Sequence, residues 1–394
     1  MSMLLFMPWC PIDKVYEVGE ITILPFTRHI AINGLDEAAQ CKINAIMATY
    51  RGIDGKPIQK ASLIRYRGKS PIEELTDDEI EIVQDFAVIA CFAGLANREY
   101  FNKIGRYCNS DCFLLYIQKF ENANFTALTV RRREGRTLSP WALDDITITI
   151  PIHCHTIQEV SLDSALLKAL WDHRAQLNND DWGRWQNAIS CFNQANTDSD
   201  NIRHQVEWVL LCSAFEHFLG AKSEAKDVAG KFAEALVPSR ELLAKDAVRL
   251  SGQQKNGGKS LRYEWMREFY RIRGDFAHGK MVSQQPATWN PLEHLVLATL
   301  AFPLLVKSLL SKASKYKLTD YDQAQLDSFE QFANTLDCLK PPSNQKGSLD
   351  SHWKRLLDAS RWNIASQRAL NQAKESLTPD QQGDLEEKPE KDGQ

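Results

Sequence analysis

The sequence predicts an α+β domain followed by an all-helical bundle, because the residue pattern changes once along the chain. Up to about residue 155, segments that alternate between apolar and polar residues accompany one long helical pattern. Beyond that point apolar residues recur at the three- and four-residue spacing of helices. At roughly 100–200 residues per domain, the length also favours more than one domain. We therefore expect an α+β sensor or regulatory domain at 1–156, a helical bundle at 157–340, a C-terminal helix at 341–377 and a disordered tail at 378–394.

The first domain contains the strand-like segments and one well-marked helix. Alternation predicts strands at 16–26, 112–120, 125–132 and 146–152. Thr76 and Glu79 form a capping-box pattern, and apolar residues follow it at helical spacing toward residue 100. This segment is therefore expected to be the main helix of the domain.

The second half of the chain reads as a series of helices. They are expected at 161–176, 181–194, 202–219, 227–244, 261–278 and 292–315, with one more at 349–376. Trp208, Leu211, Phe215 and Phe218 mark one face of the third helix, which predicts a central place in the bundle. A glycine-rich polar loop at 251–260 precedes the fifth helix.

Charge and composition limit the class of protein. The net charge of −4 and the pI near 6.2 argue against a globally basic nucleic-acid coat, so contact with RNA requires local patches. The most apolar segment, 292–310, is interrupted by Glu293, His294 and Lys307, and about 18 apolar residues are needed to span a bilayer. The first residues lack a basic leader and are broken by Pro8. We expect a cytoplasmic protein that does not enter membranes.

The nine cysteines show no disulfide framework and are expected to be reduced. Cys108 with Cys112, and His153-Cys154-His155, offer zinc-type ligands. The first pair departs from the common two-residue spacing, so buried thiols and strand histidines are the favoured interpretation. We expect neither a metal nor a cofactor.

The six residues from Arg273 to His278 pair a permanent cation with an imidazole that titrates near neutral pH. This combination suits cleavage of a phosphodiester without a metal. An ordinary alternative exists, because a cation and a histidine also favour a helix C-terminus, and Gly279 is a common residue after a helix end.

The wider stretch 269–279 resembles the HEPN domain, an all-helical fold of prokaryotic defence and toxin ribonucleases. The order of Tyr270, Arg273, His278 and Gly279 is similar to that of the Apea-like branch. The helix at 209–220 resembles an earlier core helix of the family, with its acidic residue at Glu216. The resemblance covers roughly residues 161–315. Gly274 departs from the polar residue that many members have after the arginine, and this raises the question whether the helix continues there.

Helical geometry separates the two motif residues. At about 100° per residue, Arg273 and His278 lie about 140° apart, whereas Arg271, Asp275 and His278 fall within about 60°. One chain would therefore struggle to direct Arg273 and His278 at one phosphate. The resemblance implies a homodimer in which two motif helices build one composite cleft.

The resemblance implies a metal-independent endoribonuclease that acts in anti-phage defence or as a toxin on tRNA or mRNA. Its trigger would be a phage or cellular component. The alternative is a non-catalytic HEPN-like protein that dimerises or binds a nucleotide or partner. The expected roles are catalysis by Arg273 and His278, support by Asp275, Arg271 and Glu216, and RNA binding by Lys280, Arg267, Arg262 and Lys259.

Overall fold

The computed structural model describes residues 2–32, 35–99, 107–120, 147–154, 156, 159–251, 258–277, 287–339 and 351–375. The chain divides into two compact units. Unit 1 comprises Met1–Ala235 and Arg262–Lys317, and unit 2 comprises Leu236–Leu261 and Leu318–Gln394. This division runs through the helical region, so the sheet and most helices pack within unit 1. The domain boundaries expected from the sequence remain predictions.

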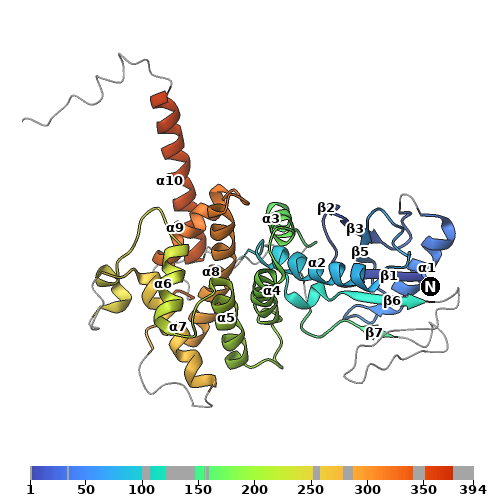
Figure 1. Cartoon of the computed structure of the whole chain (residues 1–394), viewed down its shortest axis with the longest axis horizontal. Coiled ribbons are helices and arrows are strands. Elements are labelled where there is room, and N and C mark those ends of the chain that lie inside the picture. Colours follow the sequence, from blue (N-terminus) through green and yellow to red (C-terminus); the bar gives the residue numbers. More distant parts are fainter. Residues whose placement is uncertain are drawn as a thin grey trace, which may run out of the picture. The chain divides into compact units, whose positions relative to one another are not determined.

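Unit 1 begins with a five-stranded antiparallel sheet in the order β2-β3-β5-β1-β6 (Figure 1). A short parallel pair, β4 with β7, lies outside this sheet. The strands are β1 (Ser2–Met7), β2 (Tyr16–Val18), β3 (Ile21–Thr27), β4 (Tyr50–Arg51), β5 (Lys60–Tyr66), β6 (Tyr116–Phe120) and β7 (Ile148–Thr149).

The strand predictions are confirmed in part. The segment 16–26 forms the β2–β3 hairpin, which turns at Gly19 with a φ of +56°. The strand expected at 112–120 begins only at Tyr116, and that expected at 146–152 is reduced to β7. The strand expected at 125–132 lies outside the described residues.

The sequence did not predict strands β1, β4 and β5 or helix α1 (Glu37–Met47). In β1, Met3, Leu4, Leu5, Phe6 and Met7 are all buried, so both faces of the strand are apolar. A strand that is buried on both faces gives a continuous apolar run instead of alternation.

Helix α2 (Asp77–Leu95) confirms the predicted capping box. The Thr76 side chain accepts from the Glu79 backbone amide, and the Glu79 carboxylate accepts from the Thr76 amide at 2.9 Å. Beyond the cap, the helix packs against α3 (Ser164–Arg174) and α4 (Asn179–Gln194). It therefore joins the sheet region to the helical region (Figure 1).

The rest of the helical region in unit 1 consists of α5 (His204–Leu219), α6 (Ala225–Ala235), α7 (Leu261–Ala277) and α8 (Pro291–Lys312). The predicted face of α5 is buried, with Trp208, Leu211, Phe215 and Phe218 at most 3% exposed. An N-terminal β-sheet with short helices followed by an all-helical region is therefore confirmed.

Helix α8 lies at the centre of these helices and contacts α3, α5 and α6. Among the described residues it is the one helix long and apolar enough to cross a membrane. However, 78% of its most apolar segment is buried inside the protein. A long, apolar and mostly buried helix is also what the core of a helical bundle contains.

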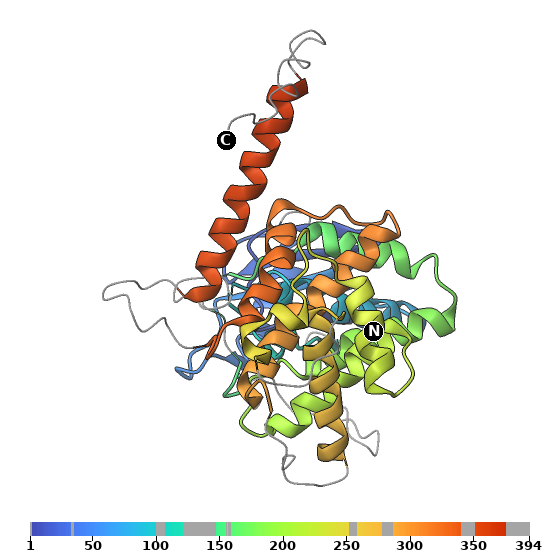
Figure 2. The ribbon, with the colours of Figure 1, turned by 90° about the vertical axis from the view of Figure 1, so that its left-hand side faces the viewer.

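Unit 2 is built around α9 (Asp320–Asn334) and α10 (His352–Glu375), the latter drawn in red in Figure 2. The two helices run antiparallel. Trp353 at the start of α10 packs on Phe332 near the end of α9, with ring centroids 5.0 Å apart. At the other end, Arg368 donates to Asp320 at 2.6 Å. The sequence predicted α10 but not α9.

Candidate functional site

Helix α7, which carries the arginine of the motif, is fixed against α5 by aromatic contacts that centre on Trp208. Trp208 of α5 stacks on Phe269 of α7 at 4.9 Å between ring centroids. Its indole nitrogen also donates to the Phe269 carbonyl at 2.9 Å. Trp265 and Ile272, which lie four residues before and three after Phe269, are buried as well. These contacts determine which face of α7 lies against the core.

Arg273, Tyr270 and Glu216 form a connected polar cluster where α7 meets α5. The Arg273 guanidinium donates to the Tyr270 hydroxyl at 2.9 Å and lies 3.4 Å from the Glu216 carboxylate. Tyr270 donates to Glu216, which also accepts from Ser223. The Arg273 guanidinium carbon lies 5.2 Å from the centre of the Tyr270 ring, a cation–π distance. The structure thus brings together Arg273 and the distant acidic residue of the family resemblance.

The protonation states in this cluster follow from its contacts. Burial alone would raise the pKa of Glu216, but hydrogen bonds from Ser223 and Tyr270 and the charge of Arg273 outweigh it and lower the pKa. Burial, and donation to the Glu216 carboxylate, raise the pKa of Tyr270. At neutral pH the cluster therefore contains a carboxylate, a neutral phenol and a cation.

This lowered pKa predicts a pH-dependent contribution to stability. A carboxyl with a lower pKa in the folded state stabilises the fold above its unfolded pKa and loses that contribution as pH falls through the folded value. We expect the melting temperature of the wild type to exceed that of Glu216→Gln at pH 7, and this difference to shrink below about pH 4. Thermal melts of both proteins at the two pH values measure it. An equal difference at both values would contradict the assigned cause.

The Arg273 side chain is held in place without being fully enclosed, with 27% of it exposed. Its Nε is buried and has no hydrogen-bond partner among the described residues. A guanidinium presents five N–H donors, and only Nη1 has the contacts given above. The cation therefore retains donors for an additional anionic partner.

The continuity of the motif helix is resolved as far as Ala277. Helix α7 runs through Gly274, and a Cβ added there would meet nothing within 4 Å. The described part of helix α7 stops at Ala277. The catalytic His278 and the RNA-binding Lys280 expected from the sequence lie outside the described residues.

Gly274 offers a stabilising substitution. Alanine has better helix propensity than glycine, and the site has room for its methyl group. Gly274→Ala is expected to raise the free energy of unfolding by about 0.5–1 kcal/mol, measured by urea denaturation. Gly19→Ala is the contrasting control, because its φ is +56° and its Cβ would lie 2.2 Å from Trp171 Nε1. A loss of stability in Gly274→Ala would show that the helix is interrupted there.

The other predicted site residues are not gathered at Arg273. Arg271 is exposed and Asp275 is half-buried, both on α7. Arg267 pairs with Glu264 at 2.7 Å. Arg262 is only 5% exposed and donates from Nε to the Ala233 carbonyl at 3.1 Å, which leaves little surface for a phosphate.

Lys259, the remaining predicted RNA contact, belongs to unit 2, whereas Arg273 belongs to unit 1. The basic rim expected from the sequence therefore stays a prediction, because its described members belong to two units. Neither the burial of these cations nor the unit to which each belongs can be read from the sequence.

Glu268 of α7 and His294 of α8, which were not predicted as site residues, connect the two helices by hydrogen bonds. The Glu268 carboxylate accepts from His294 Nε2 at 3.1 Å and from the backbone amides of Thr288 and Trp289 at 2.9 and 3.1 Å. Burial opposes the charge of Glu268, but these hydrogen bonds, led by His294, lower its pKa. His294 is fully buried, so the pair supports the fold.

The possible zinc ligands lie among buried thiols. Cys112 and Cys154 are buried with their sulfurs 3.8 Å apart, and Cys108 is buried too. The hydrogen bond with Cys154, together with burial, raises the pKa of Cys112. His155 lies outside the described residues. Neither here nor elsewhere in the described ranges is a cluster of three or more histidine, cysteine, aspartate or glutamate residues placed to hold a metal.

Comparisons with known proteins add no family assignment: no family model, curated protein or solved structure matches this chain.

Proposed function

We propose that this protein is a metal-independent endoribonuclease of the HEPN type, with Arg273 and His278 as its catalytic residues. The observation that carries the proposal is the partly exposed guanidinium of Arg273, held by Tyr270 and Glu216 five residues before a histidine. A cation that is oriented before the substrate arrives stabilises developing negative charge without a cost of reorganisation.

The proposed reaction is a transesterification within the RNA chain. His278 accepts the proton of the ribose 2′-hydroxyl, and the 2′-oxygen attacks the phosphorus. The bond to the 5′-oxygen breaks, and an imidazolium returns a proton to that leaving group. Arg273 neutralises the charge on the phosphate oxygens. The products are a 2′,3′-cyclic phosphate and a 5′-hydroxyl, so the substrate is RNA and not DNA.

The proposal includes a homodimer, since Arg273 and His278 are about 140° apart on an ideal helix. Two motif helices around a two-fold axis would place two copies of each residue at one phosphate. We propose that the enzyme acts in the cytoplasm on tRNA or mRNA in response to a phage or cellular trigger.

The dimer is tested by mixing two inactive variants, Arg273→Ala and His278→Ala. If one site takes residues from both chains, the mixed dimer retains one Arg273 and one His278 and recovers part of the wild-type cleavage rate. His204→Ala, an exposed histidine at the start of α5, is the matched control with unchanged activity. No recovery in mixtures that are shown to exchange subunits would contradict the composite site.

A second function, non-catalytic binding or dimerisation by a HEPN-like bundle, is favoured by one observation. The Arg273 guanidinium already lies 3.4 Å from the Glu216 carboxylate. A purely structural role, in which this ion pair holds α7 against α5, is therefore sufficient to explain the cluster. Under that alternative, Arg273→Ala lowers the melting temperature and no RNA is cleaved by any form of the protein.

A further inference from the structure

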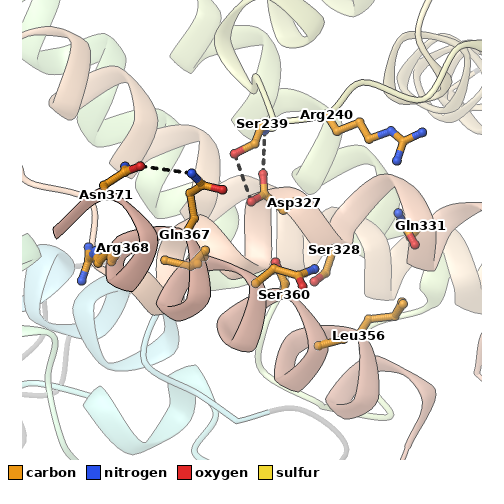
Figure 3. A pocket seen from close by; sticks show the side chains of 13 residues that line it. Ser239, Arg240, Asp327, Ser328, Gln331, Leu356, Ser360, Gln367, Arg368 and Asn371 are labelled. Atoms are coloured by element: carbon orange, nitrogen blue, oxygen red, sulfur yellow. Dashed lines mark hydrogen bonds between the residues drawn. The ribbon is translucent and has the colours of Figure 1, made fainter. Parts of the chain in front are cut away.

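Unit 2 contains a cavity of about 520 Å³ between α9, α10 and the segment that begins at Ser239 (Figure 3). Its size is within the range of about 300–1,000 Å³ that is common for small-molecule sites. One stripe of α10 lines it at three- and four-residue spacing. These α10 residues are Leu356, Ala359, Ser360, Asn363, Ile364, Gln367, Arg368 and Asn371.

A buried hydroxyl in the cavity wall lacks a partner. Ser328 of α9 is 2% exposed, and its Oγ makes no hydrogen bond in the part of the chain that the structure describes. Buried polar groups are nearly always hydrogen-bonded, because leaving one unpaired costs about 1–3 kcal/mol. In Figure 3, Ser328 is labelled among the residues that line the pocket. A polar ligand that reached this hydroxyl would supply the missing hydrogen bond.

The charges of the lining favour an anion at one place. Arg368 is neutralised by Asp320. Asp327 is an acidic residue of the lining, and its carboxylate accepts from the Ser239 amide at 2.6 Å, the Ser239 hydroxyl at 3.1 Å and Gln323 Nε2 at 3.0 Å. Arg240 is exposed, and the described ranges give it no ion-pair partner. A free guanidinium is suited to bind a phosphate.

The remaining lining suits a flat polar ring. Leu356 and Ile364 are half-buried and offer apolar contact, while the amides of Gln331 and Asn363 have no partner in the described ranges. An amide both donates and accepts, as the edge of a nucleobase does.

We propose that this cavity binds a nucleoside monophosphate, either free or as the phosphorylated end of an RNA. The phosphate contacts Arg240, and Ser328 donates to the sugar or base. This proposal is independent of the ribonuclease activity, because the cavity lies in unit 2 and Arg273 in unit 1.

Calorimetric titration of the full chain with AMP, GMP, CMP, UMP, inorganic phosphate and a short 5′-phosphorylated RNA tests this site. At least one nucleotide is expected to bind at one site per chain, with phosphate alone at least about tenfold weaker. Tighter binding of the oligonucleotide than of any mononucleotide identifies an RNA end as the ligand, and the reverse order identifies a free nucleotide.

Three substitutions make the test specific. Arg240→Gln is expected to weaken binding by about tenfold or more, because it removes a charged hydrogen-bond donor. Arg361→Gln, an exposed arginine of α10 outside the lining, is the charge-matched control and keeps wild-type affinity. Ser328→Ala is expected to raise the melting temperature of the free protein, since it removes the unpaired hydroxyl, and yet to weaken binding. Three outcomes would overturn the proposal: no saturable binding, equal affinity for phosphate alone, or equal loss in the two arginine variants.

Discussion

Replacing Arg273 with alanine is expected to lower the rate of RNA cleavage by about 10²–10³-fold, the usual effect of removing one oriented charge donor at a reacting centre. The Arg273 guanidinium donates to Tyr270 at 2.9 Å and lies 3.4 Å from Glu216, so its position is determined before RNA binds. Single-turnover cleavage of a defined RNA measures the effect on the proposed chemical step.

Two further substitutions separate charge from orientation. Arg273→Lys retains the cation but loses the planar fork, and we expect an intermediate rate. Glu216→Ala leaves Arg273 intact but removes the carboxylate that holds it, so a smaller loss of rate is expected. Melting temperatures show whether each variant is folded. A folded Arg273→Ala protein that cleaves RNA at the wild-type rate would rule out Arg273 as a catalytic residue.

The largest expected effect on stability comes from Trp208→Ala. Trp208 is 1% exposed, stacks on Phe269 and donates to its carbonyl. Loss of a buried large aromatic side chain costs about 3–5 kcal/mol in the free energy of unfolding. Urea denaturation of the purified protein measures the change.

Trp208→Phe is the matched control, because it retains an aromatic ring and loses the indole N–H. We expect a smaller loss, to which the missing hydrogen bond contributes about 0.5–1.5 kcal/mol. If Trp208→Ala unfolds at the same urea concentration as the wild type, the contact with α5 does not fix α7, and the orientation of Arg273 must have another origin.

The elements that the sequence predicted well are those whose signal is local. The capping box at Thr76 and Glu79 marks the start of α2, and the periodic face with Trp208 and Phe215 marks the buried side of α5. In contrast, β1 was missed because a strand with two buried faces has no alternation. Residue patterns along the chain therefore predict a helix or strand correctly when one of its faces is polar.

The cluster around Arg273 depends on long-range packing, which residue spacing does not encode. Glu216 and Arg273 lie on different helices, and only the family resemblance pointed to the first of them. Tyr270 was part of the quoted motif, but its hydrogen bonds to both residues emerge only from the packing of α7 on α5. Arg262 shows the converse, because its positive charge suggested the surface whereas the structure buries it.

Sequencing of RNA ends in cells tests the central claim most directly. Cells that express the wild type or His278→Ala are compared with and without phage infection, and 2′,3′-cyclic phosphate ends are captured. Cleavage by Arg273 and His278 predicts new ends of this chemistry in the wild type that are absent in His278→Ala and unchanged in His204→Ala. Identical profiles for wild type and His278→Ala, at equal protein levels in infected and uninfected cells, would contradict the assignment of this protein as a ribonuclease.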